Sequence, residues 1–338
     1  MQCESSHAIV FHQHGAADVL KWEREQLPAP GRGEVQLRHS AIGVNFIDIY
    51  DRSGLYPRAL PETPGREAAG VVVALGRGVQ GFRIGQRVAY VMAAAGAYRE
   101  RRNVSVNHLV KLPADISDEQ AAALMLKGLT AEYLLRRTYK VKPGDYLLVH
   151  AAAGGVGSLL TQWARFLGAR VIGIVGTEGK IAQAKRQGCH QVLLAGRDDV
   201  LESVRRYTRG RMVDVVYDSV GKDTFVESLN CLRPRGTMVS FGNASGPPPT
   251  IAPLELARLG SLFLTRPSLF DYIATRESLE AAARAMFALV RLKKLRVHIG
   301  QRYALADAAQ AHADLEGRRT VGACVLIPSD GNEVGSPR

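Results

Sequence analysis

The sequence lacks any cysteine spacing that builds a disulfide framework or a structural zinc site. No CxxC pair and no Cys/His spacing typical of zinc sites occurs among its four cysteines, Cys3, Cys189, Cys231 and Cys324. This scatter excludes small disulfide-stapled secreted domains and zinc ribbons. It favours a reducing, cytoplasmic compartment.

Long apolar runs are also missing. No stretch approaches the roughly 20 apolar residues that span a bilayer, and the opening MQCESSHAIVFHQHG has no apolar core behind basic residues. Neither membrane insertion nor secretion is expected.

Acidic residues are in deficit, with 32 Asp and Glu against 44 Lys and Arg, which gives a formal charge of +12. The basic residues are dispersed apart from short clusters at 99–102 and 291–296, and no aromatic motif of RNA-binding domains accompanies them. We interpret the charge as a basic surface that attracts an anionic cofactor. RNA binding is the alternative from another functional class.

The composition, with 46% apolar and 22% charged residues over 338 positions, predicts a globular chain of two domains. Residues 8–123 alternate short apolar and polar runs with turn signals, which is typical of a β-rich region. A helical segment lies within 112–139. From Tyr146 onward apolar runs alternate with helices, so we place a domain change near Gly128.

The region after Tyr146 has the βαβ rhythm of a doubly wound parallel sheet. YLLVHA (146–151) is a continuous apolar run, as in a parallel strand covered on both faces. An amphipathic helix is predicted over 155–169, because apolar residues recur there at intervals of three and four. Further strands are predicted at 170–176, 190–195, 213–221 and 236–243, and the sheet is expected to end near Thr265. Beyond it we expect a helix over 276–295, a strand at 301–305, a helix at 309–317 and a strand at 321–328.

The segment HAAAGGVG (150–157) lies between the first strand and the first helix of this βαβ unit. A dinucleotide-binding turn needs residues without bulky side chains, so that the backbone can approach a pyrophosphate at the helix N-terminus. We predict that this turn binds the cofactor through Gly154, Gly155, Val156 and Gly157. Ala152 replaces the first glycine of the usual pattern.

The end of the second strand predicts which nicotinamide cofactor binds. An acid there accepts hydrogen bonds from an NAD ribose and repels a 2′-phosphate. This chain has Gly176 at that position, followed by Thr177 and, one helical turn onward, Lys180. A hydroxyl and a cation suit a phosphate, so NADPH is predicted, although Glu178 lies among them.

Several blocks resemble the zinc-independent, zeta-crystallin-like quinone oxidoreductases of the medium-chain dehydrogenase/reductase superfamily. They include AIGVNFIDIYDRSGLYP (41–57), PGREAAGVV (64–72), HAAAGGVG, VYDSVG (216–221) and LTRPSLFDY (264–272), in the family's order. The resemblance covers nearly the whole chain.

The resemblance implies an α/β fold with two domains. A GroES-like β-rich catalytic domain would comprise 1–128 and 266–328, and a Rossmann domain with a doubly wound parallel sheet would comprise 129–265. We expect 329–338, which is small and polar, to be a disordered tail. Homodimers are usual in the family, commonly through the edges of the two Rossmann sheets.

The family's site residues map onto matching positions of this sequence. The resemblance implies a catalytic group near the substrate and nicotinamide, namely Asn45, Asp48, Tyr50, Tyr56 and Arg266. It also implies cofactor contacts from Thr130, Ser219, Phe241, Gly242, Asn243 and Arg318.

Two positions argue against a catalytic zinc ion. Asn45 stands where the sister alcohol dehydrogenases carry a cysteine ligand, and Arg66 stands where they carry a histidine. No metal is therefore expected. The family usually has a small or hydroxylated residue beside the substrate where this chain has Arg66. Relatives often have a tyrosine near the 2′-phosphate where this chain has Ala195, and Arg197 is the candidate to replace that tyrosine.

The expected activity is metal-free hydride transfer from NADPH to a quinone, with tyrosine hydroxyls as donors to the developing oxyanion. An enal or enone reductase with the same cofactor is the nearest alternative. For His150 we expect only a local hydrogen bond, and for Cys189 and Cys231 a packing role.

Overall fold

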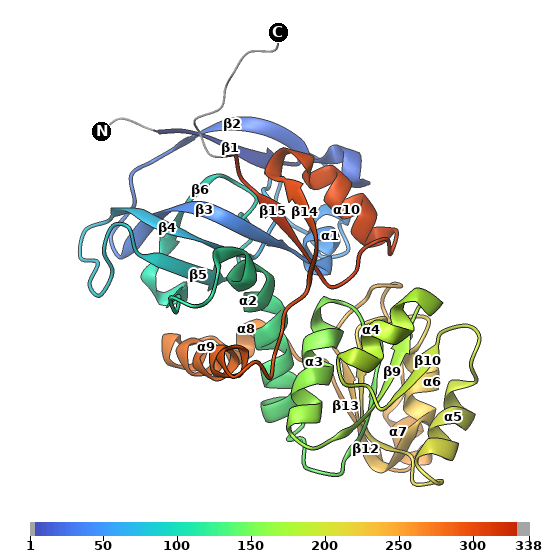
Figure 1. Ribbon diagram of the computed structural model, residues 1–338. Coiled ribbons are helices and arrows are strands. Elements are labelled where there is room, and N and C mark those ends of the chain that lie inside the picture. The colour runs from blue at the N-terminus through green and yellow to red at the C-terminus, as the bar shows by residue number, and fades with distance from the viewer. Residues whose placement is uncertain (1–3, 330–338) are drawn as a thin grey trace. The chain divides into compact units, whose positions relative to one another are not determined.

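The computed structural model describes residues 4–329 (Figure 1). Its contacts divide the chain into two compact units. Unit 1 comprises residues up to 126, 274–283 and those from 298, and unit 2 comprises 127–273 and 284–297. The sequence-based return to the first domain begins at 266, whereas these contacts assign 266–273 and 284–297 to unit 2. The expected disordered tail lies, apart from Ser329, outside the described residues.

Unit 1 is built mainly from strands. They are β1 (Glu4–Val10), β2 (Lys21–Leu27), β3 (Glu34–Val44), β4 (Glu67–Leu75), β5 (Arg87–Val91), β6 (Arg101–Ser105), β7 (Leu109–Lys111), β14 (Ile299–Ala304) and β15 (Ala323–Ile327). Among residues 4–329, β1 and β2 form an antiparallel hairpin, and a seven-stranded sheet has the order β14-β15-β3-β4-β5-β7, with β6 also paired to β3. The C-terminal β15 therefore joins the sheet beside the N-terminal β3.

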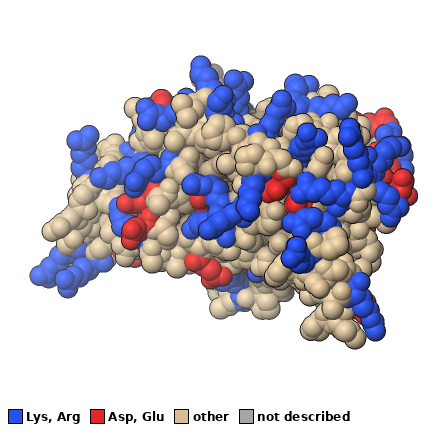
Figure 2. All heavy atoms as spheres, turned by 90° about the horizontal axis from the view of Figure 1, so that it is seen from below, with Lys and Arg blue, Asp and Glu red and all other residues tan. Residues whose placement is uncertain are grey.

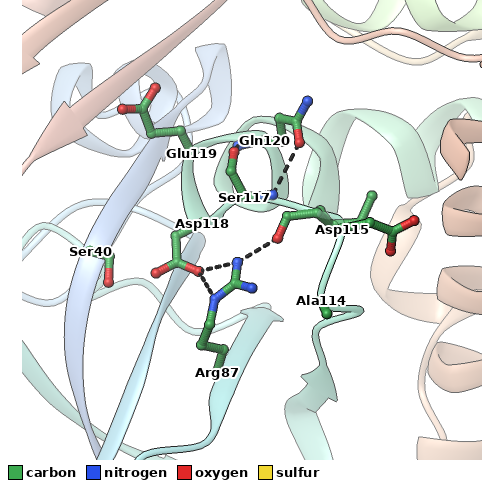
Figure 3. Close-up of a pocket in the computed structure, with 9 residues that line it drawn as sticks. Ser40, Arg87, Ala114, Asp115, Ser117, Asp118, Glu119 and Gln120 are labelled. Carbon is green, nitrogen blue, oxygen red and sulfur yellow. Dashed lines mark hydrogen bonds and ion pairs between the residues drawn. The ribbon is translucent and has the colours of Figure 1, made fainter.

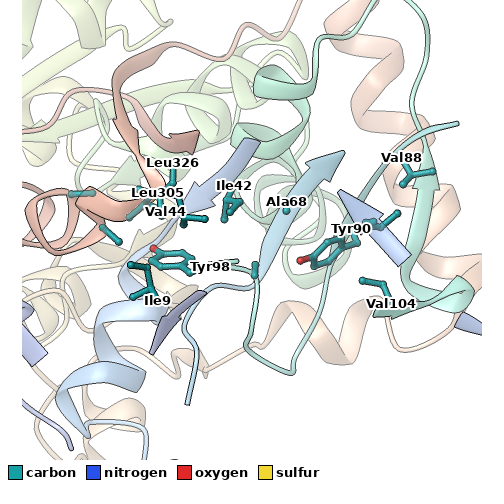
Figure 4. Packing of buried hydrophobic residues seen from close by; sticks show 14 of the residues in the cluster. Ile9, Ile42, Val44, Ala68, Val88, Tyr90, Tyr98, Val104, Leu305 and Leu326 are labelled. Carbon is teal, nitrogen blue, oxygen red and sulfur yellow. The ribbon is translucent and has the colours of Figure 1, made fainter. Parts of the chain in front are cut away.

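The helices of unit 1 are α1 (Phe46–Ser53) and α10 (Ala308–Glu316), with single 3-10 turns at 17–19, 106–108 and 305–307. Two longer helices, α2 (Asp118–Tyr133) and α9 (Arg276–Arg291), are divided between the units. Figure 4 shows the core of unit 1, where Ile9 and Ile42 from the first strands lie with Leu305 and Leu326 from the C-terminal segment. The two ends of the described chain thus share one core.

Unit 2 contains a parallel sheet. Its strands are β8 (Tyr146–Val149), β9 (Arg170–Val175), β10 (Gln191–Leu194), β11 (Val213–Asp218), β12 (Leu232–Ser240) and β13 (Phe263–Thr265). Within the described chain the order is β10-β9-β8-β11-β12-β13, with every neighbouring pair parallel. Counted from β8, this is the 3-2-1-4-5-6 order of the Rossmann fold. The strand order reverses between β8 and β11.

Helices connect the strands of unit 2. They are α3 (Gly155–Phe166), α4 (Ile181–Arg186), α5 (Val200–Tyr207), α6 (Phe225–Asn230) and α7 (Pro253–Arg258), followed by α8 (Leu269–Tyr272). Leu159, Leu160 and Trp163 of α3 are buried, which confirms the predicted apolar face. The residues of β8 from Leu147 to Val149 are fully buried, as expected for a strand covered on both faces.

Two local features differ from the sequence-based expectation. The helical segment within 112–139 ends as an α-helix at Tyr133 and continues as one π-helical turn over Leu134–Thr138. Helix α1 was not predicted from periodicity, because it has only eight residues. Its ends are defined by capping, with Asn45 at the N-cap and Gly54, at φ 82°, in the left-handed conformation that favours glycine.

Candidate nucleotide and substrate site

In unit 2 the predicted cofactor residues follow the carboxyl ends of neighbouring parallel strands. The turn 151–157 follows β8, residues 176–180 follow β9, Ser219 follows β11, residues 241–243 follow β12 and Arg266 follows β13. Because the strands are parallel, these segments lie along one edge of the sheet. Ligands of open α/β sheets bind at this edge, at the point where the strand order reverses.

The turn after β8 is shaped for close backbone approach. Ala151 has a φ of 49°, an uncommon conformation for a residue with a side chain, and its carbonyl accepts a hydrogen bond from the Gly154 N–H at 2.8 Å. A Cβ at Gly157 would lie 2.2 Å from that same Ala151 oxygen, so only glycine fits. Gly154 is the N-cap of the twelve-residue α3, with Gly155 and Val156 in its first turn. The first N–H groups of a helix have no partner within the helix, and this arrangement suits a pyrophosphate.

The segment after β9 is open and free of a fixed acid. Gly176 and Thr177 are exposed, and a Cβ at Gly176 would meet nothing within 4 Å. Glu178, the acid that argued against NADPH, forms an ion pair with the exposed Arg197. That pairing offsets the Glu178 charge, and Lys180 ends the short 3-10 turn beside it. This donor set fits a 2′-phosphate.

The loops after β11 and β12 hold each other in place. A Cβ at Gly242 would lie 2.4 Å from the Ser219 oxygen, which accepts a hydrogen bond from the Ala244 N–H at 3.2 Å. Arg266 donates to the Gly242 oxygen at 3.2 Å, so the structure brings three predicted site residues together. Phe241 is half-buried and Asn243 is 9% exposed beside them.

Sequence reasoning missed Asp218, which organises the loop after β11. Its fully buried carboxylate accepts from the N–H groups of Val220 at 2.7 Å and Gly221 at 3.1 Å, and from the Thr224 hydroxyl at 2.7 Å. An acid at the end of the apolar run VDVVYD was the available signal, because a buried carboxylate needs such donors.

Two further predicted cofactor residues lie apart from these loops in the chain. Thr130 is buried on α2 in the part that belongs to unit 2. Arg318 belongs to unit 1, where it is exposed with a φ of 57° in the turn after α10.

The four predicted substrate residues of unit 1 lie on or next to α1. The Asp48 carboxylate accepts from the Asn45 N–H at 2.9 Å and thereby caps the helix. The Tyr50 and Tyr56 rings meet edge to face at 5.3 Å, and the Phe46 ring is 6.2 Å from Tyr50. The structure therefore joins Asn45 to Asp48 and Tyr50 to Tyr56.

A buried ionic cluster surrounds this helix and was not foreseen as a cluster. Arg66, expected beside the substrate, is 1% exposed and forms an ion pair with the fully buried Asp51, which also pairs with Arg58 at 3.0 Å. The Asn45 amide donates to buried Glu67 at 2.8 Å. A guanidinium has donors only and cannot ligate a cation, and an amide replaces the thiolate that zinc prefers, so these positions do not fit a catalytic zinc ion.

Asp48 is an unusual acid. Burial and then the neighbouring Asp51 carboxylate raise the pKa of Asp48 to about 7, although Arg66 opposes that shift. Its Oδ2 also accepts from the Tyr98 hydroxyl at 3.0 Å. The Tyr98 hydroxyl in turn lies 3.0 Å from the His312 ring on α10. None of this was predicted, because the Tyr98 contacts join residues that are 50 and 214 positions apart.

The predictions for His150 and the cysteines are confirmed. His150 makes a local hydrogen bond of 2.8 Å to the Ser228 hydroxyl, and burial lowers its pKa. Cys189 and Cys231 are buried, and burial raises the pKa of each thiol to about 12. These thiols therefore stay protonated and act as packing groups.

A separate cavity of about 730 Å³ in unit 1 lies at the start of α2 (Figure 3). It is lined by Ser40, Arg87 and residues 114–120, several of them acidic. Arg87 already pairs with Asp118 at 2.7 Å, and Ser117 and Gln120 cap the helix reciprocally. The cavity holds none of the predicted site residues.

The surface charge is dispersed. On the face shown in Figure 2, lysine and arginine side chains are spread out with acidic side chains between them. Many arginines have acidic partners, as Arg99 has Glu25 and Arg258 has Glu255. Across residues 4–329 no three His, Cys, Asp or Glu side chains cluster as metal ligands would, and no helix in that range has the length and apolar character to span a bilayer.

The comparisons with known proteins agree with this geometry. The chain is 50% identical to the quinone oxidoreductase of Salmonella typhimurium over 323 residues, which cover 95% of this chain and 99% of that protein. This chain belongs to the quinone oxidoreductase family. Family models for the alcohol dehydrogenase GroES-like domain and for zinc-binding dehydrogenase match 31–143 and 155–288. The quinone oxidoreductase family thus lies within the medium-chain dehydrogenase/reductase superfamily.

Two further relatives of this quinone oxidoreductase family member bear on function. The crystal structure of Escherichia coli quinone oxidoreductase complexed with NADPH superposes with a TM-score of 0.93 at 47% identity, covering 95% of this chain and all of that one. A 2-haloacrylate reductase from a Burkholderia species is 45% identical, over 95% of this chain and 98% of that protein.

Proposed function

We propose that this chain is an NADPH-dependent quinone oxidoreductase. The observation that carries the proposal is the likeness to the NADPH complex of the Escherichia coli enzyme, at a TM-score of 0.93 and 47% identity over nearly the whole chain. Quinone oxidoreductases are also the relatives at 47% to 50% identity.

The loops of unit 2 would hold the cofactor. The first turn of α3, from Gly154 to Gly157, would bind the pyrophosphate, and Gly176, Thr177 and Lys180 would receive the 2′-phosphate. Thr130, Ser219, Phe241, Gly242, Asn243 and Arg318 would complete the cofactor site. When bound, NADPH supplies the hydride. The chain's own residues orient its ring and exclude water.

The residues around α1 would face the quinone. Phe46, Tyr50 and Tyr56 form an aromatic group, which suits a flat ring, and the tyrosine hydroxyls can donate to an oxygen on which charge develops. Asn45 and Asp48, held by Glu67 and Tyr98, would line the nicotinamide end, and Arg266 would belong to the same catalytic group. We assign the substrate role to residues 1–128 and 266–328 and the cofactor role to 129–265.

A second candidate is an NADPH-dependent alkene reductase. The supporting observation is the 45% identity to a 2-haloacrylate reductase, whose substrate name denotes a conjugated carbon–carbon double bond. The same hydride chemistry serves both substrates, so the two candidates differ in the acceptor that the substrate residues accommodate.

A homodimer is proposed from the edge strand of unit 2. β13 ends the sheet, and its Phe263 is 62% exposed, with the partly exposed Leu264 beside it and the exposed Leu254 on α7. An apolar edge strand is a ready site for pairing with a second copy. We also propose a cytoplasmic location, supported by the three free, buried cysteines among the described residues.

The decisive experiment follows NADPH oxidation optically with 1,4-benzoquinone, 9,10-phenanthrenequinone and an α,β-unsaturated ketone. NADH and an added chelator serve as parallel conditions. Chelator-resistant quinone turnover that prefers NADPH is expected. Turnover of the enone alone would transfer the assignment to the alkene reductase. Tight NADPH binding without any turnover would indicate a binding protein, for which RNA is tested by titration at increasing salt.

A further inference from the structure

A continuous chain of buried hydrogen bonds leads from Asp48 on α1 to α10. Tyr98 donates to Asp48 Oδ2 at 3.0 Å, and its oxygen lies 3.0 Å from His312 Nε2. His312 Nδ1 lies 3.3 Å from Arg52 Nη1, and Arg52 Nη2 contacts Glu316 at 2.7 Å. The four inner residues are at most 1% exposed, and the Glu316 side chain is 38% exposed.

The chemistry of the groups determines which atom donates in each hydrogen bond of this series. A guanidinium has donors only, so Arg52 must donate to His312 Nδ1. Burial and then the Arg52 charge lower the pKa of His312 to about 3, so its ring is neutral and carries its proton on Nε2. His312 therefore donates to the Tyr98 oxygen. The single Tyr98 proton then points at Asp48, and it stays there because burial and Asp48 raise the pKa of Tyr98 well above its usual value.

The two oxygens of Asp48 are consequently unequal. Oδ2 accepts from both Tyr98 and the Asn45 N–H. Among residues 4–329 nothing bonds to the buried Oδ1. A proton taken up by this carboxyl group therefore belongs on Oδ1, since the lone pairs of Oδ2 are engaged.

Further charged groups on neighbouring elements act on this hydrogen-bond chain. Asp51 and Arg66 act directly on Asp48. Glu67 and Cys324 act on Tyr98, Arg58 pairs with Asp51, and Glu316 pairs with Arg52. The Arg52 guanidinium has donors only and accepts no proton, so this hydrogen-bond chain orients protons and does not conduct them to the surface.

We propose that His312 and Tyr98 are positioning residues of the substrate site, which hold Asp48 with Oδ2 committed to donors and Oδ1 as the atom that takes and releases a proton. This inference rests on the proposed function for the role of Asp48 in turnover. It assigns a task to His312, a residue of the C-terminal segment that was not among the predicted site residues.

The test compares Tyr98→Phe, His312→Leu and His312→Gln by the pH profile of quinone reduction at saturating NADPH. Removing the Tyr98 hydroxyl takes a donor from the ionised carboxylate and moves the limb of the profile assigned to Asp48 up by about one pH unit. The direction is the same whether the active form is the acid or the carboxylate. His312→Leu weakens the Tyr98 donor and moves the limb part of the way. His312→Gln, which can accept from Arg52 and donate to Tyr98, keeps the limb in place.

His39 provides a matched control. It is a buried histidine of the same unit, hydrogen-bonded to the Tyr90 hydroxyl at 3.1 Å and to the Arg99 oxygen at 2.7 Å. His39→Leu removes comparable packing without touching Asp48, so it leaves the limb unmoved. Folded Tyr98→Phe and His312→Leu proteins whose limb matches that of the parent chain overturn the proposal.

A second readout needs no turnover. The contribution of Asp48 to the free energy of unfolding of the parent chain falls as pH rises from 3.8 toward about 7, because folded Asp48 keeps a proton that the unfolded chain has released. In Tyr98→Phe this fall extends to higher pH. If no acceptor is reduced, the proposed function fails. The unfolding profiles still decide whether the hydrogen-bond chain through Tyr98 and His312 controls the pKa of Asp48.

Discussion

An acid placed at the end of β9 should reverse the cofactor preference. A side chain at Gly176 enters open space, its backbone needs no positive φ, and the residue is exposed, so Gly176→Asp is expected to fold normally. In a water-exposed site, two unit charges at about 4 Å repel by about 1 kcal/mol. A phosphate with a charge near −2 therefore costs about 2 kcal/mol, which is about 30-fold in the Kd of NADPH.

The same acid can accept hydrogen bonds from the ribose of NADH, for a gain of about 1 kcal/mol. The ratio of the two dissociation constants should thus change by about 100-fold. Isothermal titration calorimetry with NADPH and NADH measures both values, and Gly176→Ala is the control for the added Cβ. Added salt should shrink the penalty on NADPH. Equal weakening of both cofactors, or none, would refute the placement of the 2′-phosphate beside Gly176.

Three further perturbations have defined outcomes. Gly157→Ala drives a Cβ against the Ala151 oxygen and should weaken NADPH binding at least tenfold in calorimetry, whereas Gly176→Ala should not. Asp48→Asn removes the raised pKa of about 7, whose difference from 3.8 is worth on the order of 4 kcal/mol. A raised carboxyl pKa lowers the free energy of unfolding as pH rises from 3.8 to about 7. The free energy of unfolding of the variant minus that of the parent chain, measured by chemical denaturation, should therefore be larger at pH 8 than at pH 4. Phe263→Lys should convert a species of about twice 36.7 kDa to the monomer in light scattering, and an unchanged mass would exclude the β13 edge.

The parts of this fold that the sequence predicts are those with a local sequence pattern. The run YLLVHA, the glycine turn and the amphipathic helix after it lie within 25 residues, so their order and spacing predict the βαβ unit directly. β3 spans the same residues as the alternating run EVQLRHSAIGV. The return of the C-terminal segment to the first domain was expected from the segmentation and the family resemblance, but no local pattern tells β15 to pair with β3.

The unpredicted part consists of long-range polar contacts. No local pattern indicates that Asp51 and Arg66 are buried together as an ion pair, and Arg52 meets His312 and Glu316 only after about 260 intervening residues. Charged groups that are solvated in the unfolded chain must form ion pairs when the fold buries them. The sequence does not show which single positions are buried. The raised pKa of the Asp48 carboxyl group could not be predicted from the sequence for the same reason, because it depends mainly on burial.

The pairing of β3 with β15 also constrains how the chain is made. Ile42 to Val44 have their partners at 324–326, whereas unit 2 begins and ends between 127 and 297. At 5 to 20 residues per second, a ribosome needs about 10 to 40 s to synthesise the roughly 200 residues between the first segment of unit 1 and its last strand. Unit 2 can fold during that interval, while residues 42–44 of β3 still lack their partners in β15. A nascent chain halted before residue 320 would therefore carry a finished unit 2 and an unfinished unit 1.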